Sequence, residues 1–238
     1  MIKNLLFVSH WFSKFLHPMK ILITSDNHLG FKENDDIRGN DSFNTFEEIL
    51  MIARQENVDF IIQGGDLFHD NRPSRYCIDR TVQLLNKYCT GRTKSKHKEL
   101  MRLNKMSQNV LISIPIVAIH GNHDDPSGIN RISTLNILHS AGLINYIGQY
   151  TADKIVIDPI LVENVAIYGI GHIKDKLLYT SLIEGKVVFN KPNTQKKYYS
   201  ILILHQNRVP RNKEHIPESL FDDKFDLIIY GHDMVPAR

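Results

Sequence analysis

The chain has 238 residues, which is enough for one large α/β domain or two small ones. Hydrophobic residues make up 42% and charged residues 23% of it, a composition that excludes a disordered or collagen-like chain. The net charge of +3 permits an anionic partner but does not by itself predict one, so the argument depends on where the charges lie.

Three features of the sequence bear on the cellular compartment of the protein. Cys77 and Cys89 show neither a CxxC motif nor zinc-site spacing, so we expect a reducing environment. No apolar run is long enough to span a membrane, and we expect no membrane partner. Residues 1–18 are apolar and basic without an acidic residue, which fits a transit peptide, a weak signal sequence, or an extension before a true start at Met19.

The first half of the chain alternates short apolar runs with amphipathic segments. In chain order the pattern predicts a strand at Lys20–Ser25, a helix at Ser42–Gln55 with Asp41 as its N-cap, a strand at Phe60–Gln63, a helix at Arg75–Tyr88, a strand at Ile114–Ile119 and a helix at Arg131–His139. Between the second of these helices and the strand that follows it, residues 91–106 hold six Lys and Arg residues against Glu99. This basic segment fits a solvated loop or, in a phosphodiester enzyme, a contact for backbone phosphates.

The second half is rich in strands. Residues 144–171 predict several strands in succession, and the rest predicts a short helix and two further strands: the ranges are Lys154–Ile157, Val165–Ile170, helix Asp175–Ile183, Tyr199–Leu204 and Asp226–Tyr230. Alternating strands and helices followed by a strand-rich half predict two packed sheets flanked by helices.

Polar side chains follow five of the predicted strands. The strand ends read Asp26-Asn27-His28, Gly64-Gly65-Asp66, Gly121-Asn122-His123-Asp124, His205 and Gly231-His232. Ligand sites of α/β sheets form at this edge, and mixed oxygen and imidazole donors suit Mn, Fe or Zn. A Gly-Gly-Asp alone is often a turn and a lone histidine is often a core residue, but the ordered set predicts a metal centre. We expect Asp66, on a glycine-flanked central strand end, to bridge two ions that act on a phosphate.

The order of these motifs resembles the calcineurin-like metallophosphoesterase superfamily. The flanking segments ILITSDNHLG, GGDLFHDNRPSR, IPIVAIHGNHDDPSG and VAIYGIGHIKDKLLY are similar to double-strand-break-repair nucleases of the meiotic recombination eleven and SbcD type. The similarity runs from Lys20 to about His232. It implies an α/β protein with a four-layer αββα sandwich, in which residues 19–238 form the nuclease domain after an extension at 1–18.

The resemblance also implies roles for individual residues. Asp26 and His28 would hold a first metal, Asp66 would bridge, and a second metal would be held by Asn122, His205 and His232. His123 would stabilise charge at the scissile phosphate or protonate the leaving oxygen, with His69 orienting His123 or the substrate. Candidate phosphate contacts, which equally fit surface salt bridges, are Arg72, Arg75 and Arg208.

The implied activity is that of a manganese-dependent 3′–5′ exonuclease and single-strand endonuclease of double-strand break repair, with two Mn²⁺ per site. The implied partners are DNA, an SMC-like coiled-coil ATPase subunit, a third repair-complex subunit and a second copy of the chain, and the implied location is the nucleus. Two alternatives stay open: a catalytically weakened pseudoenzyme that serves as a scaffold, and a phosphoesterase that acts on small phosphate esters.

The sequence departs from the family pattern at its end. The family has Gly-His-x-His where this chain reads Gly231-His232-Asp233-Met234, and a thioether is a poor ligand for a hard divalent ion. The resemblance therefore implies an impaired first metal site. The capping domain and the ATPase-binding segment of the family do not follow within these residues, which favours a changed reading frame or splicing after His232 over a fragment or a reduced protein. The basic segment at 91–106 also departs from the family's partner-docking loop.

Overall fold

The structure is a computed structural model that describes residues 19–91, 111–127, 129–150, 155–209, 215–221 and 223–232, together with the backbone of 5–9. The predicted basic segment beyond Gly91 and the departure at Asp233 and Met234 lie outside these residues. Among the helices that are described, none combines the length and the apolar character that a membrane crossing requires.

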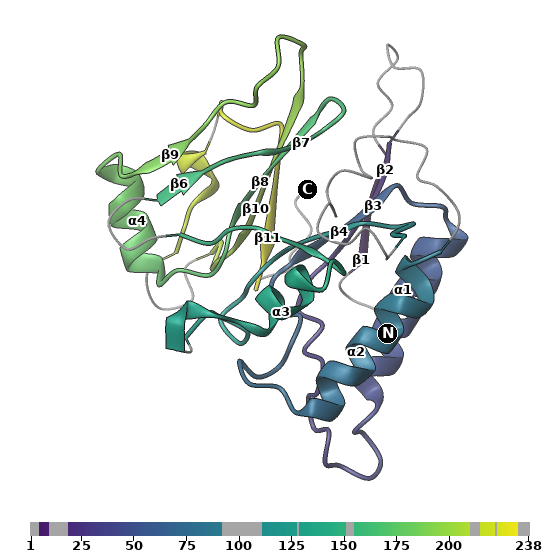
Figure 1. Ribbon diagram of the computed structural model, residues 1–238. Coiled ribbons are helices and arrows are strands. Elements are labelled where there is room, and N and C mark those ends of the chain that lie inside the picture. The colour runs from purple at the N-terminus through teal and green to yellow at the C-terminus, as the bar shows by residue number, and fades with distance from the viewer. Residues whose placement is uncertain are drawn as a thin grey trace.

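The first sheet has the strand order β1-β2-β3-β4-β5 within the described residues. Its strands are β1 (Leu5–Ser9), β2 (Lys20–Thr24), β3 (Phe60–Gly64), β4 (Ile116–Ile119) and β5 (Asn145–Tyr146). β1 runs antiparallel to β2, and the other neighbours are parallel. The parallel strands are connected by α1 (Asp41–Gln55), α2 (Arg75–Cys89) and, after the 3-10 turn Ile129–Arg131, α3 (Thr134–Ser140). Figure 1 shows α1 and α2 covering the outer face of this sheet.

The second sheet has the order β11-β10-β8-β7. Its strands are β7 (Ile160–Val162), β8 (Val165–Ile170), β10 (Tyr199–His205) and β11 (Leu227–Gly231), and all pairs except β7 with β8 are parallel. Its outer side carries α4 (Asp175–Ile183) and a parallel ribbon of β6 (Ile155–Ile157) and β9 (Val187–Phe189) (Figure 1). The turn Glu218–Leu220 precedes β11.

Three hydrophobic clusters separate the layers. Ile23 of β2 and Ile203 of β10 belong to the cluster between the two sheets, whereas their neighbours Leu22 and Leu202 belong to the clusters beneath the outer layers. Strand side chains alternate between faces, so strands buried on both faces read as unbroken apolar runs. This arrangement confirms the predicted four-layer αββα sandwich.

Two details of the predicted elements were wrong. Asn40, not Asp41, is the N-cap of α1, and its side chain makes no capping bond. The predicted helix at Arg131–His139 begins only at Thr134, because Ser133 forms a capping box with Asn136 and Asn130 breaks the helix with φ 64°. The strand at Val187–Phe189 was not predicted.

Candidate metal centre

Backbone conformation is unusual where the strands end. Asp26, His28, Asp66 and His232 have φ of 56°, 47°, 53° and 70°, in the left-handed region that non-glycine residues rarely adopt. Such conformations cost energy and gather at functional sites, where surrounding contacts maintain them. Four candidate ligands share this property, so the chain turns sharply at each strand end and carries the side chains to one place.

Two glycines allow the strand ends to approach. A Cβ on Gly65 would overlap the His205 ring, and φ there is +100°. A Cβ on Gly121 would overlap the Asp66 carboxylate. A larger residue at either position would therefore displace a candidate ligand.

One cluster of candidate ligands draws on both sheets. Asp26, Asp66, His205 and His232 each offer an atom, and these atoms all lie within 4.8 Å of one another. The His205 Nδ1–H donates to the Gly64 carbonyl at 2.8 Å, so Nε2 is the atom that faces Asp66 Oδ2, 3.3 Å away. The His232 backbone N–H donates to Asp26 Oδ2 at 3.2 Å.

A second cluster consists of three histidines. His28, His69 and His123 also offer atoms within 4.8 Å of one another, and His28 Nε2 lies 3.7 Å from Asp66 Oδ2. His123 Nδ1–H donates to the backbone carbonyl of His69 at 2.7 Å, while the two rings stack with centroids 5.0 Å apart. The structure thus places Asp26 with His205 and His232, and His28 with His69 and His123.

Buried polar atoms that have no hydrogen-bond partner test whether this arrangement fits metal ions. Asn122 Oδ1 and His205 Nε2 are buried and make no hydrogen bond. Buried polar atoms are nearly always paired, so each exception needs an explanation, and an amide oxygen and an imidazole nitrogen are both metal-ligand atoms. Together with two carboxylates, they form a donor set that fits divalent ions.

The electrostatics of the centre keep its central carboxylate ionised. Burial by itself would raise the pKa of Asp66, but the His205 imidazole, the His123 backbone N–H and His28 together outweigh burial and hold that pKa at about 2. Burial lowers the pKa of His28. Burial would also lower the pKa of His205, but the adjacent Asp66 carboxylate raises it overall. An ionised Asp66 and a neutral His28 are the protonation states that bind metals.

Asp124 holds two strand-end loops together. Its carboxylate accepts hydrogen bonds from the backbone N–H groups of Leu67, Phe68 and Gly121, at 2.8, 3.2 and 2.7 Å. Burial raises its pKa to about 6. Through these bonds the loop that carries Asp66 is joined to the loop that carries Asn122 and His123.

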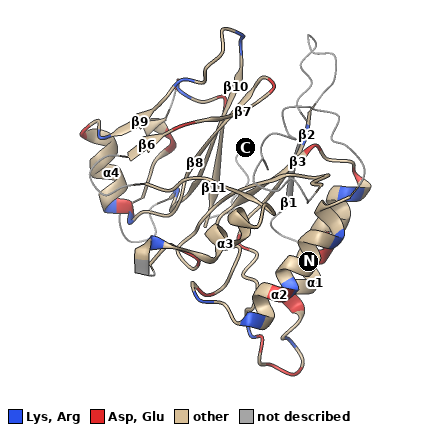
Figure 2. Ribbon diagram, viewed as in Figure 1, with Lys and Arg blue, Asp and Glu red and all other residues tan. Residues whose placement is uncertain are grey.

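The three arginines that were predicted to contact phosphates are either exposed or paired with an acidic residue. Arg72 and Arg75 are exposed, and Arg208 pairs with Glu218 at 2.8 Å, as expected for the surface salt bridge that the sequence left open. Figure 2 shows basic residues spread over α1, α2 and the loop between β9 and β10 rather than on one element. Among the described residues, charge therefore does not identify a DNA-binding face.

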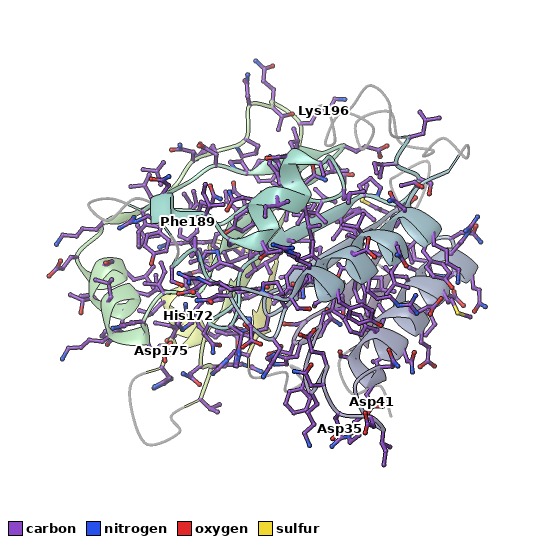
Figure 3. The ribbon with its side chains drawn as sticks, turned by 60° about the horizontal axis from the view of Figure 1, so that its bottom comes forward. Asp35, Asp41, His172, Asp175, Phe189 and Lys196 are labelled. Carbon is purple, nitrogen blue, oxygen red and sulfur yellow. The ribbon has the colours of Figure 1, made fainter. Side chains whose placement is uncertain are left out.

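Sequence reasoning missed two histidines beside the centre. The ring of His172 meets that of His205 edge to face with centroids 6.4 Å apart, and the His172 N–H donates to the His120 carbonyl at 3.0 Å. His172 follows the end of β8 by two residues, the same strand-end pattern that identified the other ligands, so the signal was present. Figure 3 shows it beside Asp175 and far from the acidic pair Asp35 and Asp41.

Comparison with known proteins agrees with this geometry. The family model described as Calcineurin-like phosphoesterase matches residues 19–236. The double-strand break repair protein MRE11 of Encephalitozoon cuniculi is 56% identical over 90% of this chain and 39% of that protein. Human MRE11 is 40% identical over 91% of this chain and 33% of that protein. Mus-23 of Neurospora crassa, also a double-strand break repair protein, is 36% identical over 90% and 32%. The chain spans about two-fifths or less of the length of these relatives.

Proposed function

The chain belongs to the calcineurin-like phosphoesterase family, and on that premise we propose that it is a manganese-dependent DNA nuclease of double-strand break repair. The observation that carries the proposal is the convergence of Asp26, Asp66, His205 and His232 from both sheets, beside the unpaired Asn122 Oδ1. The similarity to double-strand break repair proteins supports DNA as the substrate. The proposed activities are 3′–5′ exonuclease and single-strand endonuclease cleavage.

The proposed ligands are Asp26, His28, Asp66, Asn122, His205 and His232, with Asp66 shared between two ions. Two divalent ions would supply Lewis acidity toward the phosphoryl oxygens and lower the pKa of water. The protein's own part is to hold the donor atoms in place. Gly64 fixes the His205 ring through its carbonyl, and Asp124 fixes the loops around Asp66.

His123 is the proposed proton donor. Because its Nδ1–H is bound to the His69 carbonyl, Nε2 is the ring atom left to meet substrate. In the proposed reaction His123 acts as the imidazolium: its Nε2–H donates to the phosphate and then transfers that proton to the leaving oxygen, while Nδ1–H stays on the His69 carbonyl. His69 acts on it in two ways: its carbonyl sets the tautomer, and its ring stacks on the His123 ring, which restricts rotation.

The wider setting is proposed from the same relatives. Residues 19–238 would form the nuclease domain, which works in the nucleus with an SMC-like coiled-coil ATPase, a third repair subunit and a second copy of the chain. Arg72 and Arg75, which are exposed, would contact DNA phosphates, and Arg208 would do so after release from Glu218.

DNA cleavage tests the proposal. Labelled single-stranded and duplex DNA would be incubated with manganese and the chain as it stands, with Asp66→Ala, with Met234→His, and with Asp79→Asn as a control. Asp79 is an exposed acid on α2. We expect cleavage by the chain and by Asp79→Asn, and loss of at least a hundredfold in Asp66→Ala, because the shared ligand is removed.

The other outcomes would either contradict the proposal or favour another function. Undiminished cleavage by Asp66→Ala would contradict the proposal. Cleavage by Met234→His alone would mean that the chemistry is intact and the chain is a pseudoenzyme for want of one ligand. Turnover of small phosphate esters without DNA cleavage would favour a phosphoesterase of another substrate class.

A further inference from the structure

A buried glutamine precedes the strand-end loop that carries Asp66. Gln63 is the fourth residue of β3 and is 1% exposed. Its side chain lines a small internal cavity together with Phe46, Leu67 and Leu85, which are apolar. An apolar residue would fill this position without the cost of removing an amide from water. The amide therefore needs a compensating use, and its hydrogen bonds identify that use.

The Gln63 amide holds both backbone polar groups of Gly65. Its Oε1 accepts from the Gly65 N–H at 2.6 Å, and its Nε2 donates to the Gly65 carbonyl at 3.1 Å. These two bonds fix the orientation of the amide, because a flipped amide would set N–H against N–H and oxygen against oxygen. Gly65 has φ +100° and Asp66, which follows it, has φ 53°. Backbone of this kind persists where surrounding contacts maintain it, and Gln63 supplies two of them.

The same amide reaches the loop that carries the other carboxylate. Gln63 Nε2 also donates to Asn27 Oδ1 at 3.0 Å, and Asn27 Nδ2 donates in turn to Thr24 Oγ1 at 3.0 Å. Asn27 lies between Asp26 and His28 in the chain. Both N–H groups and the oxygen of the Gln63 amide are thus engaged, and a polar network that is fully paired makes its surroundings rigid. One side chain connects the loop after β2 to the loop after β3.

The backbone of the two loops meets at the same place. The Gly65 carbonyl accepts from the Asp26 N–H at 3.0 Å as well as from Gln63. The next backbone bond runs from the His28 N–H to the Asp66 carbonyl, also at 3.0 Å. A displacement of Gly65 would therefore move Asp26 and Asp66 together, although the Gln63 amide bonds to neither carboxylate.

We propose that Gln63 is a positioning residue of the metal centre, which holds Gly65 and Asn27 so that the carboxylates of Asp26 and Asp66 face the same ion. This role rests on the proposed metal-dependent function and deepens it, because it assigns part of the metal affinity to a side chain that is not a ligand. Residues that orient metal ligands in this way account for a roughly ten- to hundredfold change in metal affinity.

Manganese affinity tests this role, because it is measured without substrate. Isothermal titration with MnCl₂ would compare the chain with Gln63→Met, a substitution that nearly keeps the side-chain volume and removes the amide. We expect Gln63→Met to bind manganese at least tenfold more weakly. Ser200→Ala is the matched control, because Ser200 is also buried, bonds to Asp226 Oδ2 at 2.8 Å and lies near the opposite end of β10 from His205. It should bind manganese like the parent chain.

Two results would overturn the role of Gln63 and leave the proposed function intact. These are an unchanged manganese affinity in Gln63→Met, and an equal loss of affinity in Gln63→Met and Ser200→Ala. If Gln63→Met does not fold, Asn27→Ala replaces it, because Asn27 is only half-buried and its loss breaks the link between the two loops. Weaker manganese binding by Asn27→Ala than by Ser200→Ala would support the role, and equal binding would overturn it.

If the chain itself binds no manganese, the proposed function fails, and the Gly65 amide proton decides about Gln63. Its hydrogen exchange would be followed by nuclear magnetic resonance in the metal-free protein. We expect exchange to be at least tenfold faster in Gln63→Met than in the chain, because the Gly65 N–H loses its acceptor. Equal exchange in the two proteins would overturn the role of Gln63.

Discussion

Single residues at the strand ends are constrained by both conformation and space. Asp26, His28, Asp66 and His232 sit in left-handed backbone, and Gly65 faces the His205 ring without room for a Cβ. These constraints have the same result, because each lets a polar side chain from a parallel strand reach a common point. The cost in backbone strain is offset by the surrounding core and by bonds such as that from the His123 N–H to Asp66 Oδ1, at 2.9 Å.

Gly65→Ala tests this constraint. The new Cβ would overlap the His205 ring and would sit on backbone with φ +100°, so we expect a loss of about 3 kcal/mol in the free energy of unfolding. Gly185→Ala is the control, because φ there is +69° but nothing lies within 4 Å, and it should cost only about 1 kcal/mol. Urea denaturation measures both, and equal losses would show that crowding at His205 contributes nothing.

At the scale of elements, the apolar runs of the sequence predicted the strands that position the metal centre. β2, β3, β4, β8, β10 and β11 lie where apolar runs placed them, since strands covered on both faces are continuously apolar. The helix before β5 was misplaced because Arg131 and Ile132 extend an apparently helical pattern. In the folded chain, Ile132 is exposed and Ser133 starts the helix. A capping box read from Ser133 and Asn136 would have located it.

Ser133→Ala measures how much that helix start contributes. Ser133 Oγ accepts from the Leu135 N–H at 3.0 Å, and its loss should destabilise the protein by about 1 kcal/mol. Ser127→Ala is a suitable comparison, because Ser127 is exposed, caps no helix and loses only a surface hydrogen bond from Asn71. Its free energy of unfolding should stay within about 0.5 kcal/mol of the parent chain. If both variants unfold at the same denaturant concentration, the capping box does not stabilise α3.

At the scale of the whole molecule, the site depends on the approach of two sheets. Strand-end residues such as Asp66 and His205 were predictable, because parallel strands deliver their C-terminal ends to one edge. The packing of two sheets was predicted from the order of strands and helices, whereas the four-layer arrangement was implied by resemblance. His120 and His172 also follow strand ends but were not singled out, and their contact forms only when β4 and β8 are brought together.

The buried histidines at this junction contribute a loss of stability in acid, which the raised pKa values of Asp124 and His205 oppose. Burial lowers the pKa of His120 to about 4 from its ordinary 6.5. Between these values the unfolded chain binds the proton and the folded chain does not, so stability falls as the pH falls through this window and is level above it. The loss amounts to at most about 3 kcal/mol for His120, and the lowered pKa of His172 acts in the same direction.

Unfolding free energies of the metal-free protein between pH 7 and pH 4 would measure this effect. His120→Gln should lower the stability at pH 7 but should lose less stability than the parent chain between pH 7 and pH 4, because the variant lacks the His120 contribution. An identical change of stability with pH in the variant and the parent chain would show that His120 contributes nothing to it.

Manganese binding tests most directly the claim that strand ends from two sheets form one metal centre. The signal of free Mn²⁺ in electron paramagnetic resonance would be followed during titration with the chain, with Asp66→Asn and with Asp79→Asn. We predict that the chain and Asp79→Asn bind manganese alike, and that Asp66→Asn binds it at least tenfold more weakly, because the central carboxylate is lost. Equal binding by all three proteins, or no binding by any, would contradict the account.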